Sequence, residues 1–309
     1  MNLKDPLVSI ITINFNNVKV TCEFLESTKK LTYKNFEIIV VDNASKENPV
    51  PIITKTYPEV RLIVNDKNLG FSGGNNTGIA AAKGEYLFIV NNDTEVTPDL
   101  LEKLLAPFYT DELIGVVSPK IKYFAHPDII QYAGFTPINQ FTGRNKCIGD
   151  HEPDRGQHDV PGYTAYAHGA AMFLKKEVVD KTGSFAEVFF LYYEELDWSA
   201  RILKAGFKIY YEPGAVIYHK ESLSVGKNSV LKTYYLTRNR ILFMRRNVSG
   251  LNNLFWPLFL IFVSLPKNTF TFIIKKEFEH LKAFYSGILW NIFHHKHGAR
   301  IKLFTKNQL

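Results

Sequence analysis

Short runs of aliphatic residues alternate with amphipathic segments through the first third of the chain. Runs of this length are typical of buried strands, and the segments between them have helical spacing. The pattern predicts strands at Leu7–Asn14, Phe36–Asp42, Val60–Asn65 and Tyr86–Asn91, and helices at Val18–Leu31, Ser72–Lys83 and Pro98–Tyr109, the last with Thr97 as N-cap. This alternation indicates an α/β fold with a mostly parallel sheet that flanking helices bury on both faces.

The pattern changes after Ser118. Glycine, proline, histidine and aromatic residues from Pro119 to Gly162 predict hairpins and long loops. Further along, we expect a strand over Tyr163–Leu174, a short helix over Leu196–Ala205, and a returning pair of strands at Lys208–Tyr211 and Ala215–Tyr218.

The last part of the chain carries two apolar segments. Leu254–Leu265 is nearly all apolar, but about 20 residues are needed to span a bilayer and Pro257 interrupts the run, so we expect it to be shallowly embedded or packed. A second stripe has helical spacing and basic neighbours: Leu281, Phe284, Tyr285, Ile288, Leu289, Ile292 and Phe293, with Lys275, Lys276, Lys282, Lys296, Arg300 and Lys302. It is typical of a helix lying on an anionic leaflet, and a core-facing helix with solvated lysines is the alternative.

Composition places the basic charge in this tail. The 309 residues are 46% hydrophobic and 22% charged, close to the globular average. Of the net charge of +7, residues from Gly226 onward carry +12, with 14 Lys and Arg against two acids, and the remainder carries −5. We therefore predict a domain of residues 1–225 followed by a basic amphipathic helical tail of residues 226–309. The tail has no groove-reading motif, which argues against nucleic acid as a partner.

Cysteine usage and the N-terminus bear on the compartment. The two cysteines are Cys22 and Cys147, and residues 1–9 contain no apolar signal-peptide core. We expect a cytoplasmic protein with reduced thiols, held by its tail on the inner face of the cell membrane.

Polar clusters follow three of the predicted strands. The first strand runs into Asn14-Phe15-Asn16-Asn17, the second into Asp42-Asn43-Ala44-Ser45, and the fourth into Asn91-Asn92-Asp93-Thr94. Ligands of open α/β sheets gather outside the carboxyl ends of the strands, so these clusters are expected to converge on one site. Each cluster taken alone has the composition of an ordinary turn or cap.

A glycine-rich stretch, Asn68–Gly78, lies between two of these clusters. Such a loop can bring backbone amides and a helix N-terminus close to a phosphate or ribose. It has neither the Lys-Ser/Thr of a P-loop nor Gly-x-Gly-x-x-Gly spacing, which argues against kinases, ATPases and dinucleotide dehydrogenases. A tight strand-to-helix turn is the alternative interpretation.

Together these segments resemble the family 2 glycosyltransferases, especially the bacterial rhamnosyltransferase-like branch. The resemblance covers Val8 to about His219 and rests on the order and spacing of Val8–Asn14, Val41–Ser45, Asn68–Gly78, Asn91–Asp93 and Tyr193–Trp198. A looser match continues through Tyr234–Asn239. The resemblance implies the glycosyltransferase-A fold, a divalent metal, either Mg²⁺ or Mn²⁺, and inversion at the anomeric carbon.

The resemblance also implies roles for individual residues. Asp93 matches the last residue of the family's metal-binding Asp-x-Asp element, while Asn91 replaces the first acid. His219 is a second candidate metal ligand, and His168 is a weaker candidate site residue. The nucleotide sugar is expected to contact Thr12, Asn14, Asp42, Asn68, Gly70, Gly74, Asn75, Asn91 and Asp93.

An acceptor hydroxyl loses a proton as it attacks the sugar, and a carboxylate is a suitable base. Glu194-Glu195 stands where the family usually has Glu-Asp, so Glu195 is the predicted base and Asp197 the alternative. These acids also suit the positive end of a helix dipole, which is their structural interpretation. Arg201, further along the same helix, is expected to pair with them or orient them.

The sequence thus predicts an inverting, metal-dependent glycosyltransferase. We expect a UDP- or dTDP-sugar as donor, with rhamnose the commonest association of the branch, and a lipid-linked or cell-surface polysaccharide acceptor. One alternative is a nucleotidyltransferase that makes nucleotide sugars, although a glycine-rich loop with Arg and Lys is then expected directly after the first strand. A non-catalytic polysaccharide- or membrane-binding module on the same fold is the other alternative.

Overall fold

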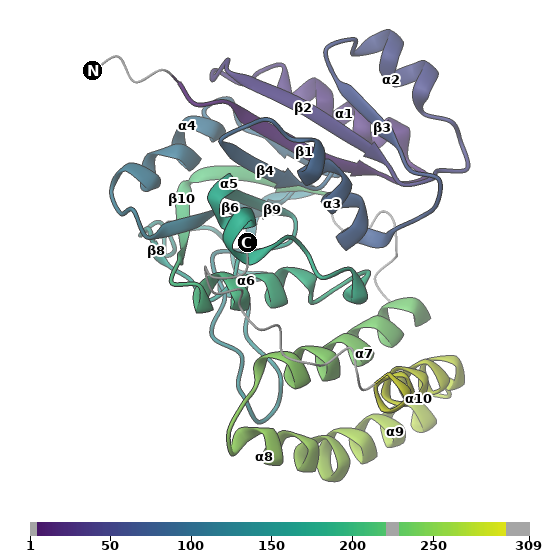
Figure 1. The fold of residues 1–309 in the computed structure, drawn as a ribbon. Helices are drawn as coiled ribbons and strands as arrows, with labels where there is room; N and C mark the ends of the chain where they lie inside the picture. Colours follow the sequence, from purple (N-terminus) through teal and green to yellow (C-terminus); the bar gives the residue numbers. More distant parts are fainter. Residues whose placement is uncertain (1–4, 221–228, 295–309) are drawn as a thin grey trace, which may run out of the picture.

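Ten strands form one mixed sheet within residues 5–220 and 229–294, which the computed structural model describes (Figure 1). One half is parallel and has the order β3-β2-β1-β4. Its strands are β1 Val8–Asn14, β2 Phe36–Asp42, β3 Arg61–Val64 and β4 Tyr86–Val90. Each lies within one residue of its predicted bounds, because an aliphatic run between polar turns marks both of its ends.

The other half of the sheet is mostly antiparallel. Beyond β4 follow β9 Ala171–Lys175, β6 Ile114–Tyr123, β10 Lys208–His219 and β5 Thr94–Val96. β7 His126–Tyr132 forms a hairpin with β6, as predicted for this region, and β8 Gly162–Tyr163 pairs with β10. Because β5 follows β4 directly and pairs with the end of β10, the segment after β4 lies beside His219.

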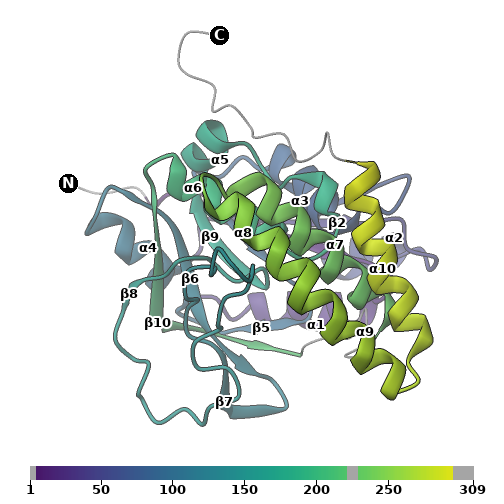
Figure 2. The same cartoon turned by 90° about the horizontal axis from the view of Figure 1, so that it is seen from below.

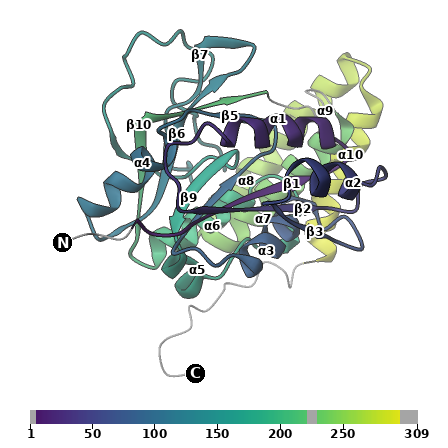
Figure 3. The same ribbon diagram turned by 90° about the horizontal axis from the view of Figure 1, so that it is seen from above.

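Helices cover both faces of the sheet. They are α1 Val18–Thr28, α2 Val50–Thr56, α3 Gly70–Ala81, α4 Leu100–Leu105 with the 3₁₀ turn Ala106–Tyr109, α5 Lys176–Thr182, the 3₁₀ turn Glu187–Phe189 and α6 Glu194–Lys204. Ile10 belongs to the same core cluster as Phe24 of α1, which runs beside β5 (Figure 3). Its neighbour Ile11 belongs to the opposite cluster with Ile79 of α3 and Trp198 of α6. The sheet is therefore buried on both faces, as predicted.

Three local predictions were wrong. The strand expected over Tyr163–Leu174 is broken into β8 and β9 by residues 164–170. The expected returning pair is the single strand β10, whose register against β6 shifts between Glu212 and Val216. Pro213 cannot donate a ladder hydrogen bond, so the strand bulges there instead of turning back. Thr97 does not cap α4, since its hydroxyl donates to the carbonyl of Val216.

The tail consists of helices beneath the sheet domain (Figure 1). They are α7 Val230–Asn247, α8 Asn252–Phe259, the π-helical turn Leu260–Ser264, α9 Leu265–Ile274 and α10 Phe278–Phe293. α7 contacts α6 and packs along α10, and α8 and α9 run along the outside (Figure 2). The predicted helical stripe is confirmed as α10, while Lys296, Arg300 and Lys302 lie outside the described residues.

The apolar run at Leu254–Leu265 is longer than predicted. Asn252–Ile274 is one helical stretch of 23 residues, of which only Trp256 and Ser264 are buried, and it is long and apolar enough to cross a membrane by length and composition. Pro257 does not end it, because the helix continues through a π-helical turn after the proline. The prediction that this run is too short to span a bilayer was therefore wrong.

Candidate active site

Hydrogen bonds link the polar ends of three strands. Asn14 Nδ2 donates to Asp42 Oδ1 at 2.7 Å, and Thr21 Oγ1 donates to Asn14 Oδ1 at 2.7 Å. Asn92 Nδ2 in turn donates to Thr21 Oγ1 at 2.8 Å, and Ser45 Oγ donates to Asp42 Oδ1 at 2.6 Å. The ends of β1, β2 and β4 therefore lie together at one edge of the sheet, as the sequence predicted.

Two buried hydroxyl groups near this edge have no hydrogen-bond partner among the described residues. They are Thr12 Oγ1 on β1 and Ser72 Oγ in the first turn of α3. An unpaired buried hydroxyl costs about 1–3 kcal/mol, so native proteins rarely leave one without a reason. Thr12 was a predicted nucleotide contact, and its unpaired hydroxyl is consistent with a site that a ligand completes.

The glycine-rich segment is held tightly by its own neighbours. Asn43 Nδ2 donates to Asn68 Oδ1 at 3.0 Å and to the Gly70 carbonyl at 2.9 Å. Gly70 has φ +71°, and a Cβ there would lie 2.4 Å from the carbonyl oxygen of Phe190. At Gly74, a Cβ would lie 2.8 Å from Ile13. Close packing thus accounts for both glycines without a ligand.

The first amides of α3 are also occupied. The Gly70 amide donates to Asn68 Oδ1, and the amides of residues 71 and 72 both donate to the Phe190 carbonyl. Asn75 is buried and donates to the Phe71 carbonyl at 3.0 Å. These three amides are not free for a phosphate, so we expect the segment to shape the wall of the donor site. The strand-to-helix turn was the better of the two interpretations for them.

Asp93 and His219 form a pair at the other side of the strand ends. Asp93 Oδ1 lies 3.1 Å from His219 Nε2, and His219 Nδ1 lies 2.8 Å from Gln131 Oε1. The backbone joins them further, since the Lys220 amide donates to the Asp93 carbonyl at 2.8 Å. Gln131 orients the imidazole, a contact that sequence reasoning missed because nothing in the sequence around β7 marks it.

His168 has a structural role. Its Nδ1 accepts a hydrogen bond from the Ala170 amide at 3.1 Å, and its ring stacks on Phe135 at 5.8 Å. Burial, reinforced by nearby His219, lowers the pKa of His168 to about 3, so the ring is neutral at pH 7. It fixes the turn at residues 168–171, whose Ala170 carbonyl accepts from the Asn91 amide at 3.0 Å.

Glu195 packs against Gly169 of this turn. A Cβ on Gly169 would lie 3.6 Å from Glu195 Cγ. Since the next residue of the turn bonds the Asn91 amide, Glu195 and Asn91 both contact this one turn. Burial raises the pKa of Glu195 to about 7, although its side chain keeps some exposure. Neighbouring Glu194 is fully enclosed, its Oε2 has no partner among the described residues, and burial raises its pKa as well. A carboxyl with a pKa near 7 suits a general base.

The residues before α6 have unusual backbone conformations. Phe190, Tyr192 and Tyr193 have φ values of 64°, 69° and 72°, a backbone region that residues other than glycine rarely adopt. Asn239 of α7 holds them: its Nδ2 donates to the carbonyls of Phe189, Leu191 and Tyr192 at 2.9, 2.8 and 2.7 Å. The tail thus fixes the segment that leads into Glu195, and only the looser match around Asn239 hinted at this in the sequence.

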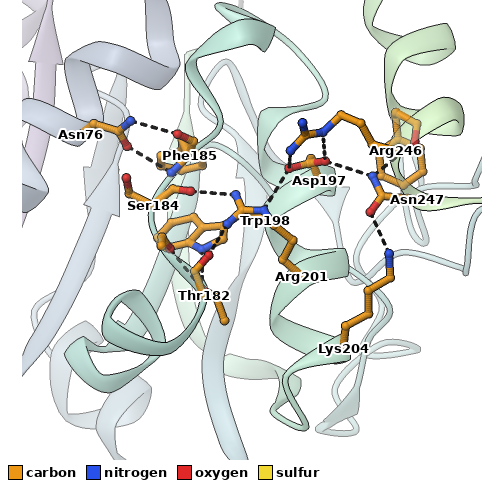
Figure 4. Close-up of polar contacts among 12 residues, drawn as sticks. Asn76, Thr182, Ser184, Phe185, Asp197, Trp198, Arg201, Lys204, Arg246 and Asn247 are labelled. Atoms are coloured by element: carbon orange, nitrogen blue, oxygen red, sulfur yellow. Dashed lines mark hydrogen bonds and ion pairs between the residues drawn. The ribbon is translucent and has the colours of Figure 1, made fainter. Parts of the chain in front are cut away.

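Asp197 is fully occupied by basic partners (Figure 4). Arg201 Nε donates to Oδ2 at 3.0 Å, as the predicted pairing required, and Arg246 Nε donates to Oδ1 at 2.9 Å. Asn247 adds a third contact at 3.0 Å. Burial alone would raise the pKa of Asp197, but Arg246 and Arg201 outweigh it and hold the pKa below its usual value. These contacts argue against Asp197 as the alternative base and make it the anchor of α7 on α6.

A family model and several known proteins match the sequence of this chain. The model of the family described as Glycosyl transferase family 2 matches residues 9–182, more than half of the chain. A Sinorhizobium fredii protein, named only as uncharacterized protein y4gI, is 29% identical over 78% of this chain and 27% of its own length. An uncharacterized glycosyltransferase of Haemophilus influenzae is 31% identical over 43% of this chain and 44% of its own. The chain thus spans less than half the length of both relatives.

A named enzyme and a solved structure are also similar. The N-acetylglucosaminyl-diphospho-decaprenol L-rhamnosyltransferase of Mycobacterium tuberculosis is 23% identical over 66% of this chain and 73% of its own. The mannosyltransferase of Pyrobaculum calidifontis, solved with GDP-Man and Mn²⁺, superposes with a TM-score of 0.57 at 15% identity over 94% of this chain and 88% of its own. At this identity the likeness shows the fold alone, which is the predicted glycosyltransferase-A fold.

Proposed function

The chain belongs to the glycosyltransferases of family 2, and on that premise we propose that it moves a sugar from a UDP- or dTDP-sugar to a lipid-linked or cell-surface polysaccharide acceptor. The name of the Mycobacterium relative supports this choice, since it joins a rhamnosyl donor to a decaprenol-linked acceptor. Rhamnose is accordingly our first candidate for the sugar. No feature of the described residues favours a nucleotidyltransferase or a non-catalytic binding module instead.

The observation that carries the proposal is the position of Glu195, whose pKa burial raises to about 7: it packs against Gly169 of the turn whose Ala170 carbonyl accepts from the Asn91 amide after β4. Glu195 removes the proton from the acceptor hydroxyl as its oxygen bonds to the anomeric carbon. The bond from that carbon to the diphosphate breaks, and the nucleoside diphosphate leaves with the electron pair. A single displacement of this kind inverts the anomeric carbon.

The residues present suit a divalent cation. Asp93 and His219 offer one carboxylate oxygen and one imidazole nitrogen 3.1 Å apart. The described residues contain no group of three or more His, Cys, Asp or Glu side chains, so Asp93 and His219 would hold the cation as two protein ligands and leave room for donor oxygens and water. Mg²⁺ and Mn²⁺ suit such a site, because they combine one or two carboxylates with substrate phosphates. When bound there, such a cation would supply the positive charge that neutralises the leaving diphosphate.

The nucleotide is proposed to lie along the network of Asn14, Asp42 and Ser45. Asp42 is buried and oriented by both neighbours, so one carboxylate oxygen is fixed in place for a base or ribose hydroxyl. The unpaired hydroxyl of Thr12 lies on the same strand end. Asn68, Gly70, Gly74 and Asn75 form the wall of this site.

We further propose that residues 1–225 form the catalytic domain and that the tail from residue 226 binds the inner face of the cell membrane peripherally. Its outer surface is apolar, with Phe262 and Phe270 exposed by 72% and 67%. The stretch Asn252–Ile274 carries Lys267 near its middle and contacts α7 and α10, so lying in the interface suits it better than crossing the bilayer.

The direct test is release of nucleotide from candidate donors. The purified chain is incubated with UDP- and dTDP-sugars, Mn²⁺ and a polyprenyl-diphosphate-linked acceptor, and the consumed donor is identified by mass spectrometry. We expect one donor to be consumed only when acceptor is present. Absence of nucleotide release with every donor contradicts the proposal, and UDP binding without release supports the non-catalytic module.

A further inference from the structure

β7 contains a β-bulge at Gln131. Ile121 of β6 pairs with Tyr132 of β7. The next residue of β6, Lys122, pairs with Ile130, so Gln131 is an extra residue in its strand. A bulge locally bends a strand and re-aims a side chain, and bulges are over-represented next to active sites. Here the side chain of the extra residue reaches across β6, which lies between β7 and β10, to the histidine at the end of β10.

Gln131 is buried, and its side chain has one hydrogen-bond contact within residues 5–220 and 229–294. That contact joins Gln131 Oε1 to His219 Nδ1 at 2.8 Å. Burying a primary amide costs free energy that a single hydrogen bond does not fully offset. An aliphatic residue such as the neighbouring Ile130 would fill a strand position without that cost. The contact with His219 is therefore the feature that a glutamine adds at this position.

The Gln131 oxygen determines which nitrogen of His219 carries the hydrogen. An amide oxygen only accepts hydrogen bonds, so Nδ1 is the donor and has to carry a hydrogen. A neutral imidazole has one such hydrogen, and Nε2 then keeps its lone pair. Nε2 lies 3.1 Å from Asp93 Oδ1, which is also an acceptor. Two acceptors that face each other repel, and a cation bound by both removes the repulsion.

The distance of 3.1 Å between His219 Nε2 and Asp93 Oδ1 fits two ligands of one ion. Adjacent ligands of an octahedral Mg²⁺ lie about 3 Å apart when each is about 2.1 Å from the ion. The same distance also fits a hydrogen bond from Nε2–H to Asp93, but that tautomer requires Gln131 to donate to Nδ1 through its amide nitrogen. In the structure the amide oxygen faces Nδ1, and this orientation selects the tautomer that can bind a cation.

We propose that Gln131 is a positioning residue that keeps the hydrogen of His219 on Nδ1 and so presents the Nε2 lone pair to a divalent cation beside Asp93. The inference rests on the proposed function, which assigns the cation to His219 and Asp93. The role of Gln131 is indirect, because its oxygen is occupied by the imidazole. Without that oxygen, Nε2–H is free to donate to Asp93, and a pair that is closed by its own hydrogen bond binds a cation less well.

The first measurement reads the tautomer and needs neither cation nor turnover. Long-range ¹H–¹⁵N spectra of the metal-free full chain show which imidazole nitrogen carries hydrogen, at about pH 8, where an ordinary imidazole is neutral. His219→Gln identifies the signals of His219. We expect hydrogen on Nδ1 alone in wild type, and on Nε2 in Gln131→Leu, where Asp93 is the remaining acceptor. In Gln131→Glu we expect Nδ1 to keep its hydrogen, because a carboxylate also only accepts.

The second measurement is the Kd for Mn²⁺ in the presence of saturating UDP, from the electron paramagnetic resonance signal of free Mn²⁺. Gln131→Leu is expected to weaken Mn²⁺ binding about ten- to hundredfold, the usual effect of removing a group that orients a metal-bound histidine. Gln131→Glu is expected to bind Mn²⁺ at least as tightly as wild type, which a role in packing alone does not predict. Gln157→Leu is the matched control and is expected to change nothing, since Gln157 is exposed and donates to the Pro153 carbonyl in its own loop.

Hydrogen on Nε2 in the wild-type chain overturns the inference, and so does Mn²⁺ binding by Gln131→Leu at wild-type affinity. If Gln131→Leu does not fold, the wild-type tautomer and Gln131→Glu carry the test, because loss of Mn²⁺ binding in Gln131→Glu shows that Gln131 donates to the ring. UDP binding is titrated in parallel. A wild-type chain that binds neither UDP nor Mn²⁺ contradicts the proposed function, whereas normal binding of both, with equal Mn²⁺ affinities for wild type and Gln131→Leu, contradicts only the role of Gln131.

Discussion

Replacing Asn239 by Leu is expected to impair catalysis from a distance. Asn239 is fully buried and its Nδ2 donates to three carbonyls of residues 189, 191 and 192. Phe189 keeps a partner in the variant, because Arg238 Nη2 also donates to its carbonyl at 2.7 Å. The carbonyls of Leu191 and Tyr192 lose theirs. At about 1–3 kcal/mol for each buried unpaired group, and with both residues only partly buried, we expect a loss of about 2–4 kcal/mol in the free energy of unfolding.

The same change is expected to lower kcat. The left-handed conformations of Phe190, Tyr192 and Tyr193 cost of order 1 kcal/mol each and persist only while their surroundings hold them. Without Asn239 the segment relaxes, and Glu195 moves with the start of α6. A displacement of about 1 Å at a catalytic group costs up to about a hundredfold in rate.

Urea denaturation and nucleotide-release kinetics measure the two effects. UDP affinity is expected to fall less than kcat, because this segment meets the proposed donor-site wall at the Phe190 carbonyl, which accepts from the amides of residues 71 and 72, whereas Asn14 and Asp42 are held by their own hydrogen bond. Asn252→Leu, which removes one exposed side-chain hydrogen bond of the same tail, is the control and is expected to change stability by less than about 0.5 kcal/mol. An Asn239→Leu chain with wild-type stability and kcat refutes the argument that α7 positions the base.

Three further predictions concern pH, the tail anchor and the membrane. Since a base acts only when ionised and burial raises the pKa of Glu195 to about 7, kcat is expected to fall about tenfold per pH unit below pH 7; a rate profile that stays flat down to pH 5.5 contradicts this. Asp197→Asn leaves Arg201 and Arg246 without their carboxylate and is expected to cost about 3–5 kcal/mol in thermal unfolding, whereas an unchanged Tm contradicts the anchor role. Phe262→Asp places a charge on the exposed apolar surface and is expected to reduce co-sedimentation with anionic phospholipid vesicles severalfold, with equal binding contradicting the membrane role.

The sequence predicted the parallel half of the fold well and the rest less well. β1, β2 and β4 are largely buried aliphatic runs with polar ends and β3 is a short, partly exposed aliphatic run at the sheet edge, so local pattern alone locates them. β10 contains Pro213 and Gly214, which have the composition of a turn, and only pairing with β6 keeps the strand extended through the bulge. A proline misled the prediction in the same way at Asn252–Ile274: Pro257 suggested that the apolar run is interrupted, but the helix continues through it.

The candidate site shows the same division. Asp42 and Asp93 were predicted to lie at one site because each follows the end of a strand. The hydrogen bonds beside them join residues at or next to those strand ends. Gln131, Asn239 and Arg246 act on residues far away in the sequence. The looser family match around Asn239 was a hint for that residue, and the sequence around Gln131 and Arg246 contained none. Asp197 and Glu195 lie two residues apart on one helix, and only tertiary contacts distinguish an ion-paired anchor from a carboxyl with a raised pKa.

Turnover of Glu195→Gln at saturating donor and Mn²⁺ tests the central claim most directly. Glutamine keeps the size of the side chain and cannot accept the proton, so we predict that kcat falls at least a hundredfold while the Kd for UDP stays unchanged. Near-normal turnover in a variant that binds UDP normally contradicts the account, because proton removal then belongs to a different group.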